Sequence, residues 1–181
     1  MLDYDAVPTT VTIIGIDHCI QSTQELHTSA AEIYEQKLSK LVGARNPVLI
    51  CEEAKHAEVK SIAQAIADSH GHRYCNVDMT RLERKRRGIP YDYASYPEET
   101  SKYGVQQIKS WHAERETFML CGIRRAFSSA AQSQSLDLIV ICGSRHIDAL
   151  ATALEQWVSP GGVTKLNWTG SRDGCQVHLD L

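Results

Sequence analysis

Long hydrophobic runs, paired cysteines and glycine-rich phosphate loops are all missing from this sequence. No apolar stretch approaches the ~20 residues that a membrane-spanning helix needs, so we expect no membrane span. Neither a G-x-G-x-x-G fingerprint nor a P-loop is present, which argues against the common nucleotide-binding motifs. The first residues are acidic and include no basic segment followed by an apolar one, so we expect no secretory signal.

Cysteine usage and net charge narrow the class of protein further. The six cysteines contain no C-x-x-C pair, and Cys51, Cys75 and Cys142 lie inside apolar, strand-like runs. Single buried thiols of this kind are typical of a reducing compartment rather than of a disulfide framework. The formal charge of -3 over 181 residues gives no indication of nucleic-acid binding. We therefore expect a soluble, cytoplasmic protein with one domain over 1–181 and neither a nucleic-acid nor a membrane partner.

Short apolar runs alternate with segments of helical periodicity along most of the chain. The runs are rich in β-branched residues, which predicts strands covered on both faces. Strands that alternate with helices predict an α/β fold, a three-layer sandwich with a mostly parallel central sheet and helices on both faces. We expect strands at 10–16, 47–51, 73–77, 136–142 and 163–168, with a possible further edge at 176–179 left open, and helices at about 23–43, 59–67, 101–128 and 147–157.

Two G-x-x-H turns follow predicted strands. The first runs from Gly15 to His18 and the second from Gly143 to His146. Open α/β sheets bind ligands beyond the carboxyl ends of their strands. One histidine at such a position is usually a hydrogen-bonded loop residue, but the repeated spacing favours a shared site. We expect the two strands to lie side by side and to end in the same direction, which makes the two imidazoles neighbours.

Carboxylates stand at the same strand ends. Glu52 and Glu53 end the second predicted strand, Asp78 follows the third, and Asp17 precedes His18. Two neutral imidazoles with one or two carboxylates suit a divalent metal such as zinc or manganese, which would acidify a bound water. Without a metal, the same groups could act as general acid and base. The structural alternatives are that the glutamate pair opens a helix and that the aspartate caps one.

The long helix predicted over 101–128 carries a charged residue on its apolar face. Arg115 lies four residues after Trp111 and three before Phe118, both on that face, and Glu116 lies in the adjacent row. Burying a guanidinium without a partner is unfavourable, so a carboxylate or an anionic ligand should meet it. We therefore expect Arg115 and Glu116 to point at the core or at a cleft beside it.

Two segments receive no definite role. The basic run 81–87 is more typical of a solvated face than of a nucleic-acid patch in a chain of net negative charge. The tyrosine-rich loop 88–97 suits either an ordinary surface loop or a lid over a substrate.

The order of these motifs resembles the TraB/Tiki/ChaN/erythromycin-esterase-like superfamily. The matching stretches are the two G-x-x-H turns, the acidic segment 51–53 and the helical segment 115–119, within about 13–154 of the chain. The resemblance implies a small, stand-alone member of a group that includes metal-dependent proteases, macrolide esterases, haem-binding proteins and regulators of pheromone activity in plasmid transfer. Carried over to this chain, its site would consist of His18, Glu52 or Glu53, Arg115, Glu116 and His146.

Our preferred hypothesis is a metal-assisted hydrolase of an ester, amide or phosphoester, acting on a small-molecule or peptide substrate. A remaining carboxylate would orient or deprotonate the water, and Arg115 would stabilise negative charge in the transition state. The predicted metal ligands are His18, Glu52 and His146, the predicted catalytic residues are Glu53, Arg115 and Glu116, and Asp17 and Asp78 are further candidates.

Two rival hypotheses use the same strand ends. A non-catalytic binding module could hold a small anionic ligand or haem in the cleft. Nucleophilic catalysis by Ser144 is the weaker rival, because the segment around it is not a G-x-S-x-G elbow.

Overall fold

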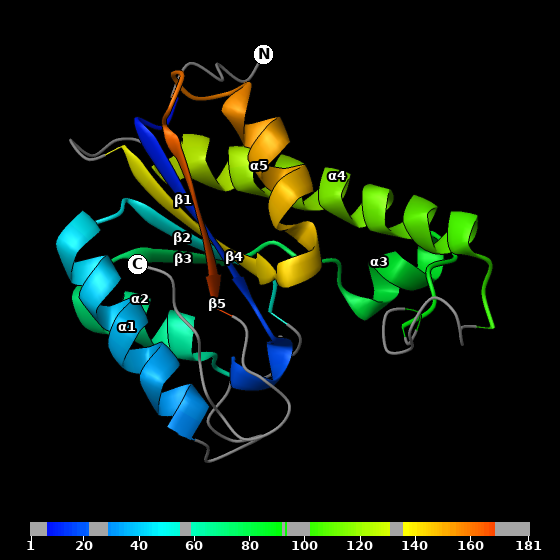
Figure 1. Cartoon of the computed structure of the whole chain (residues 1–181), viewed down its shortest axis with the longest axis horizontal. Coiled ribbons are helices and arrows are strands. Elements are labelled where there is room, and N and C mark those ends of the chain that lie inside the picture. Colours follow the sequence, from blue (N-terminus) through cyan, green and yellow to red (C-terminus); the bar gives the residue numbers. More distant parts are fainter. Residues whose placement is uncertain are drawn as a thin grey trace.

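A parallel β-sheet forms the middle layer of the molecule (Figure 1). The computed structural model describes residues 7–21, 29–54, 59–91, 93, 102–130 and 136–168. The strands in these ranges are β1 (Thr10–Ile16), β2 (Leu49–Glu52), β3 (Arg73–Asn76), β4 (Asp137–Gly143) and β5 (Val163–Trp168). They lie in the order β3-β2-β4-β1-β5, and each neighbouring pair is parallel.

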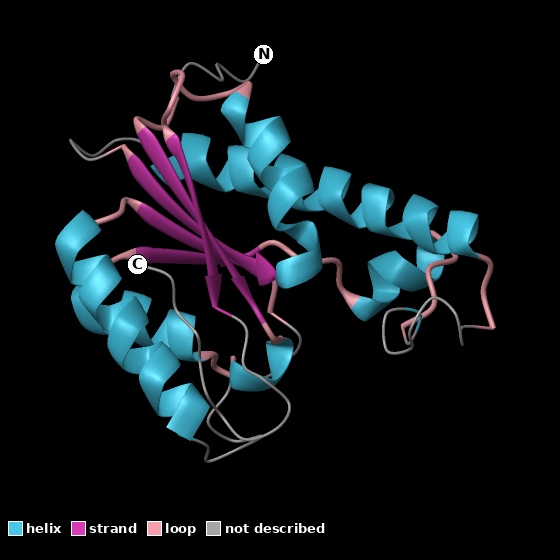
Figure 2. Ribbon diagram, in the orientation of Figure 1, coloured by secondary structure: helices cyan, strands magenta, loops and turns pink. Residues whose placement is uncertain are grey.

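Helices cover both faces of this sheet (Figure 2). The helices of the described ranges are α1 (Ser29–Arg45), α2 (Ile62–His70), α3 (Arg81–Arg86), α4 (Val105–Ala130) and α5 (Ile147–Glu155), with short 3₁₀ turns η1 (His18–Ile20) and η4 (Ser144–His146). Because strand side chains alternate between faces, Ile14 and Ile141 pack under α1 and α2, whereas Ile13 and Val140 pack under α4 and α5. The predicted three-layer α/β sandwich is confirmed.

The element boundaries lie close to those expected from the sequence. The bounds of β1 and β5 match, and the other strands shift by one or two residues. Helix α2 begins at Ile62 because the side chain of Ser61 accepts the N–H of Gln64 at 3.0 Å and caps the first turn. The predicted start of the first helix and the predicted edge strand at 176–179 lie outside the described residues.

A small third core lies beyond the end of the sheet. Its residues come from the segments on either side of α3 and from the first half of α4, and α3 and this half of α4 extend away from the sheet in Figure 1. We call this part, residues 79–91, 93 and 102–118, the arm. The basic run falls mainly on α3, and Lys85 and Arg86 there are exposed. The buried members of the arm's core are Met79, Ile89, Tyr93, Ile108 and Trp111.

No helix in the part of the chain that the structure describes combines the length and the apolar character needed to cross a bilayer.

We expect Gly15→Ala to destabilise the fold, because β1 and α5 approach each other too closely at this position for a methyl group. A Cβ there would stand 2.0 Å from Cδ1 of Ile147 and 3.1 Å from Cα of Ser144. Overpacking of this kind typically lowers the free energy of unfolding by about 1–3 kcal/mol. Gly43→Ala is the matched control, since Gly43 is exposed in α1 and alanine should stabilise that helix by up to about 1 kcal/mol. Urea denaturation measures the free energy of unfolding of both variants. Equal changes in the two would contradict the close approach of β1 and α5 at Gly15.

Candidate functional site

The carboxyl ends of β1 and β4 lie side by side in the interior of the sheet. The two strands are parallel neighbours, with Ile16 opposite Gly143, so the expectation that they pair and end in the same direction is confirmed. From β1 the chain continues to α1 on one face and then to β2. From β4 it continues to α5 on the other face and then to β5. In open α/β sheets, the point where successive connections diverge is where ligands bind.

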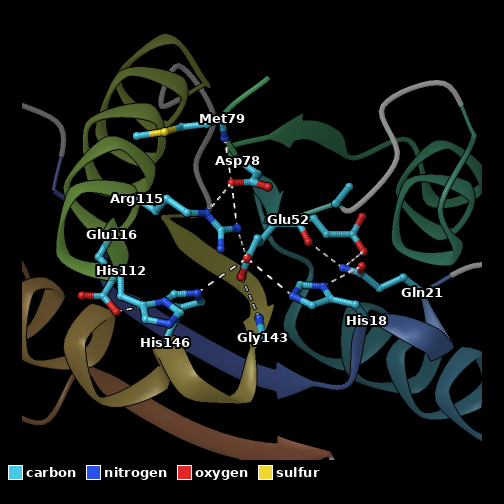
Figure 3. A network of polar contacts seen from close by, with 12 residues as sticks. His18, Gln21, Glu52, Asp78, Met79, His112, Arg115, Glu116, Gly143 and His146 are labelled. Atoms are coloured by element: carbon cyan, nitrogen blue, oxygen red, sulfur yellow. Dashed lines mark hydrogen bonds and ion pairs between the residues drawn. The ribbon is translucent and has the colours of Figure 1, made fainter. Parts of the chain in front are cut away.

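Both predicted histidines point at one carboxylate (Figure 3). The Nε2 atom of His18 lies 3.5 Å from Oε1 of Glu53, and the Nε2 atom of His146 lies 3.7 Å from the same oxygen. His18 begins the 3₁₀ turn η1 one residue after β1, and His146 ends η4, which follows β4 directly, so both rings lie at this edge. The side chain of His146 is 4% exposed and that of His18 is 35% exposed. A ligand therefore reaches His18 more easily.

The other nitrogen of each imidazole has its own partner. Nδ1 of His18 lies 3.0 Å from Oε1 of Gln21, and Nδ1 of His146 lies 2.8 Å from Oε1 of Glu116. An ionised Glu116 can only accept, so Nδ1 of His146 carries a proton. In the neutral ring the Nε2 lone pair then faces Glu53. This is how carboxylates orient catalytic and metal-binding histidines.

Glu53 is the centre of the cluster and is almost fully buried. Its Oε2 accepts the backbone N–H of Gly143 at 2.8 Å, and its Oε1 accepts from Nη2 of Arg115. Burial alone would raise the pKa of Glu53, but the interactions with His18, His146 and Arg115 outweigh it and hold that pKa well below its ordinary value. Burial likewise opposes protonation of His18, yet the interaction with Glu53 raises the pKa of that ring. Glu53 is therefore ionised at neutral pH.

The glycine of the second G-x-x-H turn makes room for the first histidine. A Cβ at Gly143 would stand 2.8 Å from Nε2 of His18 and 3.4 Å from Oε2 of Glu53. Any larger residue would displace the imidazole or the carboxylate, so this motif position is explained by packing within the site.

Arg115 connects α4 to the strand ends. Its Nη2 contacts Glu53 and lies 3.0 Å from Oδ1 of Asp78, and its Nη1 donates to the hydroxyl of Tyr93 at 3.3 Å. Asp78 also accepts from Nη2 of Arg84 at 2.5 Å. The buried guanidinium thus meets carboxylates from the residue after β2 and from the segment after β3, as expected for an arginine on an apolar helix face.

Two predicted site residues do not join this cluster. Successive residues at the end of β2 point to opposite faces, so Glu53 faces α4 while Glu52 faces the side of α1 and α2. The carboxylate of Glu52 accepts from Oγ of Ser61 at 2.5 Å and from the hydroxyl of Tyr74 at 2.7 Å. This orientation does not fit the prediction that Glu52 shares a metal with the two histidines. Asp17 precedes η1, and its side chain makes no capping hydrogen bond.

Gln21, Tyr93 and His112 also belong to the site, although they are not among the residues predicted from the sequence. The ring of His112 lies 5.2 Å from that of His146, and its Nδ1 lies 3.2 Å from the hydroxyl of Tyr93. Burial, followed by the charge of His146, lowers the pKa of His112 to about 4, so this ring is neutral at pH 7. Helical spacing could have identified His112, which is four residues before Glu116. Gln21 and Tyr93 lie in connecting segments that carry no such signal.

The cluster contains suitable atoms for zinc or manganese but not a suitable arrangement. Imidazole nitrogens and carboxylate oxygens are common ligands of both metals. However, Arg115 donates to the same Glu53 oxygen that both imidazoles face, which places a fixed positive charge beside any bound cation. Within the described ranges, no three His, Cys, Asp or Glu side chains are grouped so that they could hold a metal ion. The metal stays a prediction.

The protein is thus an α/β domain with a cluster of polar side chains at the carboxyl edge of its parallel sheet. Comparisons with protein family models, with curated proteins and with solved structures found no match for this chain. The resemblance to the TraB/Tiki-like superfamily therefore stays a prediction.

We expect Arg115→Leu to destabilise the fold strongly, because Glu53 and Asp78 would remain buried without their shared cation. Breaking a buried ion pair typically lowers the free energy of unfolding by about 3–5 kcal/mol. Arg87→Leu is the matched control, since its guanidinium pairs at 2.8 Å with Glu114 near the surface, where such pairs contribute about 0–1 kcal/mol. Chemical denaturation compares the two variants. Similar losses of unfolding free energy in the two variants would show that the buried ion pairs contribute no more to stability than the surface pair.

Proposed function

We propose that this protein is a hydrolase that cleaves an ester, amide or phosphoester bond in a small-molecule or peptide substrate. The observation that carries the proposal is the convergence of Nε2 of His18 and Nε2 of His146 on one oxygen of Glu53, at 3.5 and 3.7 Å. Two imidazoles directed at one point can take a proton from water and give a proton to a leaving group, as hydrolysis requires. The two histidines also follow the neighbouring carboxyl ends of β1 and β4, where open α/β sheets bind their ligands, and this supports the same proposal.

His146 has the features of a general base. Glu116 holds its Nδ1 at 2.8 Å, which fixes the ring and stabilises the imidazolium that forms when Nε2 takes up a proton. In the proposed reaction, Nε2 of His146 deprotonates the attacking water, and Glu116 keeps the ring oriented.

His18 has the features of a general acid. Its pKa is raised by the interaction with Glu53 against the opposing effect of burial, so more of the ring is protonated than in a free histidine. It is also the more exposed of the two rings. In the proposed reaction, His18 protonates the leaving group from Nε2.

Arg115 and Glu53 set the charge of the centre. The ionised Glu53 attracts the protonated forms of both rings, and Arg115 adds a fixed positive charge that favours negative charge developing on the substrate. Contacts with Glu53, Asp78 and Tyr93 already hold the guanidinium in place, so it needs no reorientation during the reaction.

A binding protein without turnover is the second candidate. The N–H of Gly143 and the guanidinium of Arg115 both donate to Glu53, and donors of this kind also hold carboxylate and phosphate ligands. A small anionic ligand would use this edge of the sheet without any proton transfer.

We expect His146→Ala to lower kcat by about 10²–10⁴-fold, the usual contribution of a general base. His70→Ala is the matched control, because His70 is exposed on α2 and its ring lies beside Ser39, which is not part of the site. Both variants are assayed against p-nitrophenyl esters, anilides and phosphodiesters, with circular dichroism to confirm folding. Equal rates in wild type and His146→Ala would contradict the proposed base. Wild-type protein that binds acetate, phosphate or haemin without turning over any of the panel would favour the binding module.

We expect hydrolysis to persist after divalent metals are removed, because the described side chains supply an acid, a base and a fixed positive charge. The measurement compares the rate before and after treatment with EDTA and dialysis, and then after addition of zinc or manganese. Loss of activity on chelation, with recovery on addition of either metal, would support the metal-assisted enzyme predicted from the sequence.

A further inference from the structure

We infer that Gln21 is a positioning residue, which decides which ring nitrogen of His18 carries the permanent proton, and that Glu52 orients Gln21 from the other side of the sheet. The inference rests on the proposed function, in which His18 exchanges a proton through Nε2. It gives Glu52, a residue predicted to bind metal, a role in the same site that requires no metal.

Every polar atom of the Gln21 side chain has a partner. Nε2 of Gln21 donates to Oε1 of Glu52 at 3.1 Å and to the backbone oxygen of Glu53 at 2.7 Å. Its Oε1 lies 3.0 Å from Nδ1 of His18. The residue is 4% exposed, and its backbone oxygen accepts the N–H of Ile62 at 2.9 Å, so both its main chain and its side chain are fixed.

Only one orientation of the Gln21 amide satisfies these contacts. Turning the amide by 180° would place its oxygen against a carboxylate oxygen of Glu52 and against the carbonyl oxygen of Glu53. The carbonyl of Glu53 can never donate, whatever the protonation of Glu52, so the turned amide is excluded. The amide oxygen of Gln21 therefore faces His18.

The orientation of the amide fixes the proton on His18. An amide oxygen is an acceptor only, so the ring nitrogen that faces it, Nδ1, has to carry a hydrogen. In the neutral ring this leaves the lone pair on Nε2, the atom that lies 3.5 Å from Glu53. Without Gln21 the neutral ring would prefer the other tautomer, with the N–H on Nε2 directed at the carboxylate. Gln21 thus opposes a preference that Glu53 imposes.

Glu52 is held as a fixed acceptor for this purpose. Ser61 and Tyr74 donate to its Oε2 at 2.5 and 2.7 Å, which leaves Oε1 for Gln21. Ser61 itself accepts from Gln64 at the start of α2, so its single hydroxyl hydrogen is directed at the carboxylate. A chain of defined donors and acceptors therefore runs from α2 through Glu52 and Gln21 to His18.

Nitrogen NMR of histidine-labelled protein tests the inference directly. At a pH where the His18 ring is neutral, long-range ¹⁵N–¹H correlations distinguish a protonated ring nitrogen from one with a lone pair. Comparison with His18→Asn assigns the signals. We expect the wild type to carry its hydrogen on Nδ1 of His18. A hydrogen on Nε2 would overturn the inference.

Two variants separate positioning from a merely structural role. Gln21→Met should shift neutral His18 toward the Nε2–H tautomer and lower kcat by about 10- to 100-fold with little change in KM. Gln36→Met changes an exposed residue of α1 and should alter neither the tautomer of His18 nor kcat. Gln21→Glu brings two carboxylates together and should also lose activity.

The tautomer measurement needs no substrate, so the two proposals fail separately. If His18 carries the expected hydrogen and loses it in Gln21→Met, but no substrate is ever turned over, the hydrolase fails and the positioning of His18 stands. If hydrolysis depends on His146 but Gln21→Met leaves the tautomer of His18 unchanged, the positioning role is overturned and the hydrolase stands. Should Gln21→Met fail to fold, the wild-type spectrum still decides, because a hydrogen on Nε2 of His18 would overturn the inference by itself.

Discussion

An ionised carboxylate without access to water is the constraint on which the site depends. A buried charge persists only where donors and opposite charges replace the water that it has lost. For Glu53 they come from the main chain of Gly143, from Arg115, and from the imidazoles of His18 and His146 when these carry a proton on Nε2. These groups come from the turn after β1, from the end of β4 with the turn that follows it, and from α4. The carboxylate therefore joins the ends of three strands to α4, and no one of these elements could shift alone without exposing it.

The same requirement extends into the arm. Asp78 sits between Arg115 of α4 and Arg84 of α3, so two cations share the negative charge at the end of β3. Tyr93 accepts from the remaining end of the Arg115 guanidinium and packs in the arm's core. Tyr93 thus connects the ion pairs at the end of β3 to the apolar core of the arm.

The fold and the pairing of the histidines could be predicted because they follow from local patterns: apolar runs, helical periodicity and a repeated turn after a strand. The choice between Glu52 and Glu53 could not, because one residue of difference at a strand end reverses the face to which a side chain points. Gln21 was also missed. Its role depends on contacts with β2 and α2, segments distant in sequence, and a lone glutamine after a turn carries no periodic signal.

Helix α4 serves two parts of the molecule at once. Its 26 residues extend about 39 Å at 1.5 Å per residue. One end packs in the arm through Trp111, the other packs on the sheet through Phe127, and Arg115 and Glu116 lie between. Since an α-helix is stiff along its axis, the place of the arm and the distance from Glu116 to His146 are coupled through one rigid element.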